Sequence, residues 1–277
     1  MIPLPSASGG RFSLSEEAQL LRAVLFDLWG TLIAEDPVAG EARRLLRIRM
    51  AREALAEFGF DYPDADIQAA FLAAGVEHEQ LHASERDFTA RGRTVAYLRQ
   101  LDDQLGERLD ERAWARLDDA ILTPMLTHRP VIMQDARETL EAVRALGLSV
   151  GLISNTGITP GFVLRRILND MGLWRLLRHA VFSDEAELAK PATALFESAL
   201  DEMNVTAAEA AFLGDQPRLD VAGARRAGMW SLQIGDVAAI EGVAPHARIG
   251  ALAELLPALR TLELLPEVSP RAAAAER

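Results

Sequence analysis

Three predicted strands of this sequence end at polar side chains, which carry carboxylate, hydroxyl or amide groups. They are, in chain order, Asp27, Ser154-Asn155 and Asp215. Because the carboxyl ends of parallel strands border the crevice of an open α/β sheet, we expect these side chains to lie together. A carboxylate in such a crevice can attack phosphorus and hold it as an acyl phosphate, which divides one difficult displacement into two steps. The Ser154 hydroxyl and backbone N–H groups near Asn155 can hold phosphate oxygens. The pattern therefore favours phosphoryl transfer.

Cations must balance the charge that gathers in such a reaction. Hard divalent ions prefer oxygen ligands, so Asp27 and Asp215 predict a Mg²⁺ site. Lys190 is the only lysine among the 29 Lys and Arg residues. A lysine that persists where arginine supplies every other such charge indicates a position that needs a compact ammonium group. We expect Lys190 to stabilise the transition state, with Asp220 at the same edge of the sheet.

Buried strands and helices must alternate along the chain to bring these residues together. The run Ala23–Phe26 is apolar throughout, which is typical of a strand buried on both faces of a parallel sheet. After residue 129, predicted helices alternate with strands, and these strands cover 149–153, 179–182, 210–213, 230–234 and 247–249. The alternation predicts an α/β fold: a Rossmann-like, doubly wound parallel sheet with helices on both faces.

The stretch after the first strand has the helical repeat and little strand signal. Its predicted helices cover 41–58, 64–84, 88–105 and 107–122. A helical bundle inserted between two parts of another domain explains this change. We therefore expect an α/β core at 20–36 and 124–264, a helical domain at 37–123, and loose ends at 1–19 and 265–277.

Composition excludes several functional classes. The net charge of −12 disfavours binding to nucleic acid or to an anionic membrane surface. The sequence contains no cysteine, which excludes disulfides, thiolate metal sites and a cysteine nucleophile. No apolar run reaches the length of a membrane span, and the first residues lack the order of a signal peptide. We expect a cytoplasmic protein, and its oligomeric state stays open.

Four short motifs resemble, in order, those of the haloacid dehalogenase-like (HAD) hydrolase superfamily. They are Phe26-Asp27-x-x-Gly30-Thr31-Leu32, Ser154-Asn155-Thr156, Lys190-Pro191 and Gly214-Asp215-(x)4-Asp220. The continuation to Met229 is also typical, and the resemblance covers about residues 22–256. It implies a hydrolase whose helical insertion is a C1-type cap that closes over the site and helps to select the substrate. The implied substrate is a small phosphorylated molecule, and the implied cofactor is Mg²⁺.

The resemblance also implies a role for each matching residue. Asp27 is the expected nucleophile, which becomes an aspartyl-phosphate. Lys190 steadies the nucleophile and the substrate, and Asp220 supports Lys190 or a metal-bound water. Ser154 and Asn155, together with Lys190, bind the substrate through its phosphoryl oxygens.

Trp29 departs from the family pattern. The implied metal ligands are the carboxylates of Asp27 and Asp215 and the backbone carbonyl of Trp29, which the indole does not alter. Family phosphatases usually carry a second aspartate at this position, which protonates the leaving oxygen and later activates water; an indole can do neither. Loss of such a group lowers the rate by roughly 10²–10⁴. Either the leaving group needs no protonation, or a cap residue supplies the proton, or turnover is slow.

Three functions are consistent with these residues. The first is a Mg²⁺-dependent phosphatase with altered acid–base chemistry. The second is a 2-haloacid dehalogenase-like hydrolase, because dehalogenases of the family carry an aromatic residue where Trp29 stands. Asp215 argues against it, since those enzymes tend to have a neutral residue there. The third is a catalytically weak or non-enzymatic protein that binds phosphate or a partner, because a fold alone does not establish an activity.

Two further patterns have simpler explanations. His78-Glu79-x-x-His82 matches the H-E-x-x-H zinc motif, but its charged neighbours and the lack of an obvious third ligand predict a solvated helix. The arginine cluster Arg43-Arg44-x-x-Arg47-x-Arg49 could meet an anionic substrate, yet a solvated helix face is the favoured interpretation.

Overall fold

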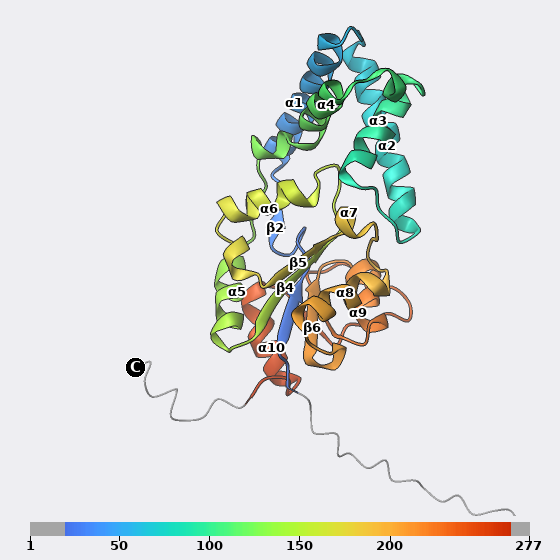
Figure 1. Cartoon of the computed structure of the whole chain (residues 1–277). Helices are drawn as coiled ribbons and strands as arrows, with labels where there is room; N and C mark the ends of the chain where they lie inside the picture. The colour runs from blue at the N-terminus through green and yellow to red at the C-terminus, as the bar shows by residue number, and fades with distance from the viewer. Residues whose placement is uncertain (1–19, 267–277) are drawn as a thin grey trace, which may run out of the picture.

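One parallel sheet with helices on both faces forms the larger part of the molecule (Figure 1). The structure, a computed structural model, describes residues 20–266. The sheet has the strand order β5-β4-β1-β6-β7-β8. Its strands are β1 (Ala23–Phe26), β4 (Ser149–Ser154), β5 (His179–Phe182), β6 (Ala210–Gly214), β7 (Trp230–Ile234) and β8 (Ala247–Ile249). The chain runs outward from β1 through β4 and then returns to its other side at β6. This order confirms the doubly wound sheet, whose crevice lies at the carboxyl end of β1.

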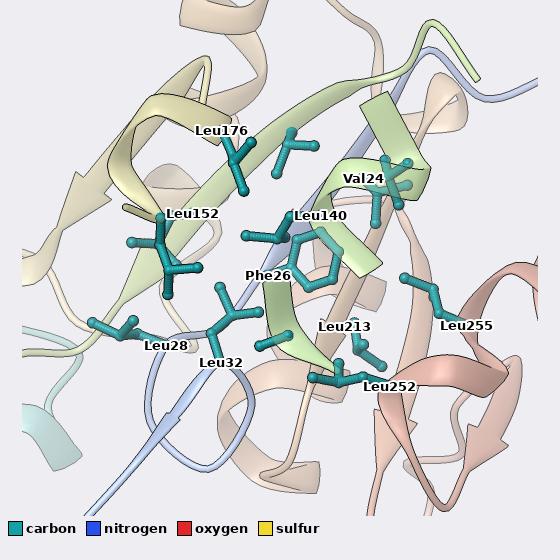
Figure 2. Close-up of a cluster of buried hydrophobic side chains, with 14 of the residues drawn as sticks. Val24, Phe26, Leu28, Leu32, Leu140, Leu152, Leu176, Leu213, Leu252 and Leu255 are labelled. Atoms are coloured by element: carbon teal, nitrogen blue, oxygen red, sulfur yellow. The ribbon is translucent and has the colours of Figure 1, made fainter. Parts of the chain in front are cut away.

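The helices of this part cover the two faces of the sheet. They are α5 (Ala136–Ala145), α6 (Gly161–Asp170), α7 (Ser183–Ala186), α8 (Thr193–Met203), α9 (Ala222–Arg226) and α10 (Leu255–Thr261). Val24 and Phe26 of β1 pack in an apolar cluster with α5, α6 and α10 (Figure 2). Ala23 and Leu25 pack in a second cluster with α8 and α9. Successive strand residues point to opposite faces, so burial on both faces explains why β1 is apolar throughout.

Four helices form a block beyond the sheet, at the top of Figure 1. They are α1 (Pro37–Glu57), α2 (Asp64–Ala83), α3 (Ala90–Leu101) and α4 (Glu111–Leu122). These helices, called the helical block below, enclose an apolar cluster of their own that includes Leu55, Ile67, Tyr97 and Leu117. The helical character of this stretch is therefore as predicted.

Several helix boundaries differ from the prediction, because capping decides them. α1 begins at Pro37, earlier than expected, since the Asp36 side chain accepts the N–H of Ala39 at 2.7 Å and proline suits a first helical turn. Between β6 and β7, where the alternation predicts a helix, the chain forms a π-type turn, Pro217–Val221, followed by the short α9.

A two-stranded antiparallel ribbon was missed by the sequence analysis. β2 (Ile33–Ala34) pairs with β3 (Val131–Ile132). Strands this short carry too little periodicity to be recognised in a sequence. The ribbon joins the segment that enters the helical block to the segment that leaves it.

The C-terminal end of the described chain is packed. Leu264 and Leu265 belong to the apolar cluster around α5 and α10, so the expected loose end does not begin at residue 265. The expectations for residues 1–19 and 267–277 lie outside the described residues. Among residues 20–266, no helix has both the length and the apolar character that crossing a bilayer requires.

Candidate active site

A buried lysine joins two carboxylates at the carboxyl edge of the sheet. Lys190 Nζ donates to Asp27 Oδ1 at 2.5 Å and to Asp220 Oδ1 at 2.7 Å. Asp27 directly follows β1, and its N–H donates to the carbonyl of Leu213 in β6 at 2.8 Å. Lys190 is 2% exposed and Asp220 1%. The strand ends therefore bring these three groups together, as the sequence predicted.

Asn155 holds the backbone from which Lys190 extends. Its Oδ1 accepts the N–H of Lys190 at 2.7 Å, and its Nδ2 donates to the carbonyl of Lys190 at 3.2 Å. Because this side-chain amide is already bonded to Lys190, any phosphate contact at Asn155 would fall to backbone N–H groups. Ser154 ends β4 and is fully buried, and its hydroxyl donates to the carbonyl of Asn155 at 3.2 Å.

Asp215 is the third carboxylate of the cluster, and a glycine makes room for it. A Cβ atom at Gly30 would lie 2.6 Å from Asp215 Oδ2, closer than any side chain tolerates. Gly30 also has a φ of +75°, which favours glycine. Gln216 Nε2 donates to Asp215 Oδ2 at 2.7 Å. Asp27, Asp215 and Asp220 each place one oxygen within 4.8 Å of the others.

Asp220 is fixed by donors on both of its oxygens. Oδ1 accepts from Lys190, and Oδ2 accepts the N–H of Gln216 at 2.8 Å. A Cβ at Gly214 would lie 2.3 Å from Asp220 Cγ, so glycine is required for this close approach. Of the two roles expected for Asp220, these contacts favour the support of Lys190 over the support of a metal-bound water.

Burial and mutual repulsion disturb the titration of this cluster. Burial raises the pKa of Asp27 to about 7; the Lys190 ammonium opposes the rise, and Asp220 and Asp215 add to it. Burial likewise raises the pKa of Asp215 above its ordinary value. Burial disfavours the charged form of Lys190, but the two carboxylates it contacts outweigh that effect and raise its pKa. The site therefore holds more negative charge than its one ammonium can balance.

The donors of this cluster fit a hard divalent cation. The cluster offers carboxylate oxygens, the ligands that Mg²⁺ prefers, and those of Asp27 and Asp215 are less occupied by protein donors than those of Asp220. Gly30, which has no side chain, leaves room beside Asp215 in its present position. A dication would offset the negative excess that Lys190 leaves.

Trp29 is half-buried beside the cluster and borders a cavity of about 630 Å³. Arg47 of α1, Met125 and Thr159 also line this cavity. It therefore lies between the turn after β1 and the helical block.

Comparison with known proteins tests the resemblance of the motifs. A family model described as a haloacid dehalogenase-like hydrolase matches residues 21–228. The chain belongs to this family. The matched range contains Asp27, Ser154, Lys190, Asp215 and Asp220.

Curated relatives of this HAD-like chain include phosphatases. Ribulose-1,5-bisphosphate 5-phosphatase of Halopiger xanaduensis is 30% identical over 209 residues, which are 75% of this chain and 82% of the relative. Glyceraldehyde 3-phosphate phosphatase of Methanopyrus kandleri is 26% identical over 219 residues, 78% of this chain and 84% of the relative.

Solved structures support the fold of the HAD-like chain. 2-Haloacid dehalogenase from Pseudomonas syringae aligns with a TM-score of 0.62 at 22% identity, over 88% of this chain and all (100%) of that one. A HAD phosphatase from Thermococcus onnurineus aligns with a TM-score of 0.57 at 20% identity, over 87% and 98%. A phosphatase and a dehalogenase match about equally well, so these alignments show the fold alone.

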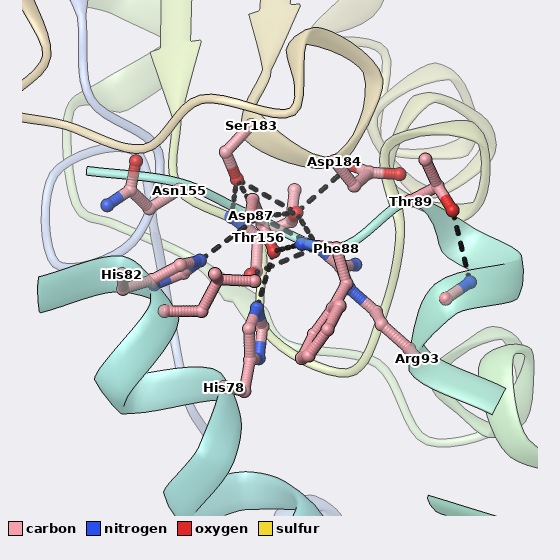
Figure 3. A network of polar contacts seen from close by, with 12 residues as sticks. His78, His82, Asp87, Phe88, Thr89, Arg93, Asn155, Thr156, Ser183 and Asp184 are labelled. Atoms are coloured by element: carbon pink, nitrogen blue, oxygen red, sulfur yellow. Dashed lines mark hydrogen bonds and ion pairs between the residues drawn. The ribbon is translucent and has the colours of Figure 1, made fainter. Parts of the chain in front are cut away.

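Glu79 and Gln80 of the H-E-x-x-H stretch are exposed, as expected for a solvated helix, but the two histidines are partly buried in a polar cluster (Figure 3). Asp87, in the loop after α2, accepts from His78 Nε2 at 2.6 Å and lies 3.0 Å from His82 Nε2. Its second oxygen accepts from Arg93 Nη2 at 2.9 Å and from the Ser183 hydroxyl at 2.5 Å. The missing third ligand thus exists, because Asp87 lies with both histidines. The Arg93 guanidinium on the same carboxylate opposes a dication there.

The same contacts connect the helical block to the core. Arg93 of α3 also donates to Thr156 Oγ1 at 2.6 Å, and the N–H of Thr156 donates to Ser183 Oγ at 2.8 Å. Burial works against ionisation of Asp87, but the hydrogen bond from His78, the adjacent His82, the Arg93 charge and the Ser183 hydroxyl outweigh it and hold its pKa well below the ordinary value. We call these residues the Asp87 cluster.

The arginine cluster on α1 also differs from the favoured interpretation. Arg43 and Arg47 are 6% and 8% exposed, while Arg49 faces solvent. Arg43 donates to the carbonyl of His128 at 2.9 Å, and Arg47 Nε donates to the carbonyl of Ile121 at 2.8 Å. A helix repeat in sequence cannot reveal this burial, because it depends on which segments pack over α1.

Proposed function

We propose that this protein is a Mg²⁺-dependent phosphomonoester hydrolase that acts on a small phosphorylated molecule through an aspartyl-phosphate at Asp27. The main observation that supports this proposal is the buried Lys190 ammonium between Asp27 and Asp220, with Asp215 as a further carboxylate nearby. The phosphatases among the relatives support the reaction class. We further propose that residues 37–123 act as a cap over the α/β core at 20–36 and 124–264, and that the enzyme works in the cytoplasm.

The proposed reaction has two halves. First, an Asp27 oxygen bonds to phosphorus while the bond from phosphorus to the ester oxygen breaks, and the departing oxygen gains a proton to become an alcohol. Then water attacks the phosphorus, releases inorganic phosphate and restores the Asp27 carboxylate. Lys190 holds the Asp27 carboxylate in place in both halves and offsets charge on the phosphoryl oxygens. The Ser154 hydroxyl and the N–H groups near Asn155 orient those oxygens.

Asp27, Asp215 and the backbone carbonyl of Trp29 would hold the metal ion. When bound, Mg²⁺ neutralises charge between nucleophile and phosphoryl group and favours ionised Asp27. Trp29 supplies no acid, so the leaving oxygen must take its proton from elsewhere. We therefore expect fast turnover only for esters whose alcohol is itself acidic.

The test is hydrolysis of 4-nitrophenyl phosphate by the purified protein, with Mg²⁺ and with chelator. We expect activity that requires Mg²⁺ and that Asp27→Asn lowers by at least about 10³-fold, since this variant lacks the nucleophile. Asp201→Asn on the exposed side of α8 is the matched control and should keep full activity. Equal activity of Asp27→Asn and the control would overturn the proposal.

A dehalogenase is the second candidate because Trp29 places an aromatic residue two positions after Asp27. The same preparation should then release halide from a 2-haloacid in the presence of chelator. Halide release without metal, with no phosphate release, would establish this alternative. Absence of both reactions, with binding of inorganic phosphate retained, would indicate a non-enzymatic phosphate-binding protein.

A further inference from the structure

A second cavity, of about 320 Å³, lies within the helical block. Its apolar lining includes Ile48, Phe71, Leu72, Phe88 and Tyr97. Arg44, Arg47 and Ile158 line both this cavity and the larger one that Trp29 borders. The two spaces therefore adjoin, and together they lead from the turn beside Asp27 into the helical block.

Unpaired cationic donors are concentrated at this inner cavity. Among residues 20–266, eight buried side-chain polar atoms have no hydrogen-bond partner. Five of them belong to residues that line the inner cavity: Arg44 Nη1, Arg47 Nη2, Arg93 Nε, Arg93 Nη1 and Tyr97 Oη. A buried donor without a partner destabilises the protein, so such a concentration indicates a ligand that supplies acceptors.

Arg47 is the strongest of these donors. Arg44 is bonded to Glu41, and Arg93 is paired with Asp87. No ion pair among residues 20–266 includes Arg47, whose Nε reaches only the carbonyl of Ile121. Burial and the neighbouring Arg43 lower the pKa of Arg47 to about 10, while Glu35 opposes this shift. The guanidinium thus remains charged at neutral pH while it lacks a counter-ion.

We propose that the inner cavity is a second-anion subsite, and that the natural substrate is a phosphomonoester whose apolar leaving group carries a distal carboxylate or phosphate bound by Arg47. The apolar side chains of the cavity contact the body of the leaving group. This inference rests on the proposed phosphatase function and specifies its substrate class.

The subsite predicts a preference that wild-type protein can reveal. The probes are aryl phosphates with a para alkyl side chain of increasing length that ends in a carboxylate, each paired with its methyl ester. Both members of a pair have nearly the same leaving oxygen, so they differ only at the distal group. We expect the acid to exceed its ester in kcat/KM by roughly 10–100-fold at the length that reaches Arg47, since a charge-assisted hydrogen bond is lost in the ester.

Variants test whether Arg47 is responsible for the preference for the acid over its methyl ester. Arg47→Met keeps the length of the side chain without its charge and should bring the ratio of acid to ester close to one. Arg47→Lys keeps the charge and should retain part of the ratio. Arg49→Met, an exposed position on the same helix, should leave the ratio as in wild type.

The outcomes separate this inference from the function on which it rests. Hydrolysis of 4-nitrophenyl phosphate together with equal rates for acids and esters at every length would overturn the subsite and leave the phosphatase intact. A preference that survives in Arg47→Met would also overturn it. Lack of hydrolysis of every phosphomonoester would overturn both. A side-chain phosphate in place of the carboxylate shows which of the two anions fits better.

Discussion

Two buried charged clusters differ in the balance of their charges. In the Asp27 cluster, three carboxylates share one ammonium, and burial raises the pKa of Asp27 and of Asp215. In the Asp87 cluster, one carboxylate accepts from Arg93, Ser183 and His78, and its pKa is lowered. Either group of side chains could by distance hold a metal ion. Only the first has a deficit of positive charge that a cation would correct.

Under the proposed function, this difference in charge balance separates a reactive cluster from a structural one. A carboxylate that protein donors already satisfy has little reason to bind a metal or to attack a substrate. Its removal leaves Arg93 buried without the carboxylate that it contacts, and only the nearby Asp184 then offsets its charge. A carboxylate that is crowded by other carboxylates gains from a cation and from reaction with an electrophile, and such strain is common at catalytic centres. Proximity of ligand atoms alone would have ranked the two clusters as equals.

The largest difference between the two clusters should appear in the free energy of unfolding of their variants. Asp87→Asn should lower the free energy of unfolding by roughly 3–5 kcal/mol, because a buried arginine loses its partner. Asp27→Asn should leave stability unchanged or raise it, because it relieves repulsion among carboxylates. The measurement is urea unfolding of metal-free protein. Asp102→Asn, which breaks the exposed pair with Arg108, is the control and should cost at most about 1 kcal/mol. A loss of stability in Asp27→Asn as large as that in Asp87→Asn would erase the contrast.

The second prediction concerns the general acid for the leaving oxygen, which the Asp27 cluster lacks. Trp29→Asp places a carboxyl group where family phosphatases carry one and should raise kcat for alkyl phosphates by roughly 10²-fold. The gain should be much smaller for 4-nitrophenyl phosphate, whose leaving oxygen needs no proton. Trp29→Phe is the control and should give neither gain. Equal gains for both substrates would mean that the indole limits the reaction by bulk rather than by lack of an acid.

The smallest effect is the pH dependence of stability in metal-free protein, on the order of 1–3 kcal/mol in each window. Asp87 has a lowered pKa in the folded state, so its contribution is present above about pH 4, near the ordinary value of an aspartate, and is lost as the pH falls below it. Asp27 has a folded pKa of about 7. Its unfolded form ionises first, so stability should decline as the pH rises from about 4 to 7.

Thermal melts across pH separate the two contributions. The decline between about pH 4 and 7 should shrink in Asp27→Asn, and the loss in acid should shrink in Asp87→Asn. Mg²⁺ should suppress the decline in stability between about pH 4 and 7 without changing the loss of stability at lower pH. If the decline persists in Asp27→Asn, another group such as Asp215 or Asp184, whose pKa burial also raises, is responsible for it.

Periodicity made the sheet and its polar edge predictable. A strand buried on both faces is apolar throughout, so a single carboxylate at its end, such as Asp27, is conspicuous. The same reasoning pointed to Ser154 and Asp215, whereas Lys190 stood out as the only lysine of the sequence. The ribbon of β2 and β3 was not predicted, because strands of two residues show no periodicity. The start of α1 was predicted too late, because the Asp36 cap determines where this helix begins.

The sequence by itself determined the α/β sheet and the residues at the carboxyl ends of its strands, because the two-residue period and the direction of parallel strands place those ends at one edge. Only the tertiary structure decided what Asp87 and Arg47 do. Their partners come from other segments: Asp87 meets Ser183 of the core, and Arg47 of α1 reaches the end of α4. Such meetings follow from how side chains pack between elements, which no repeat within one element records.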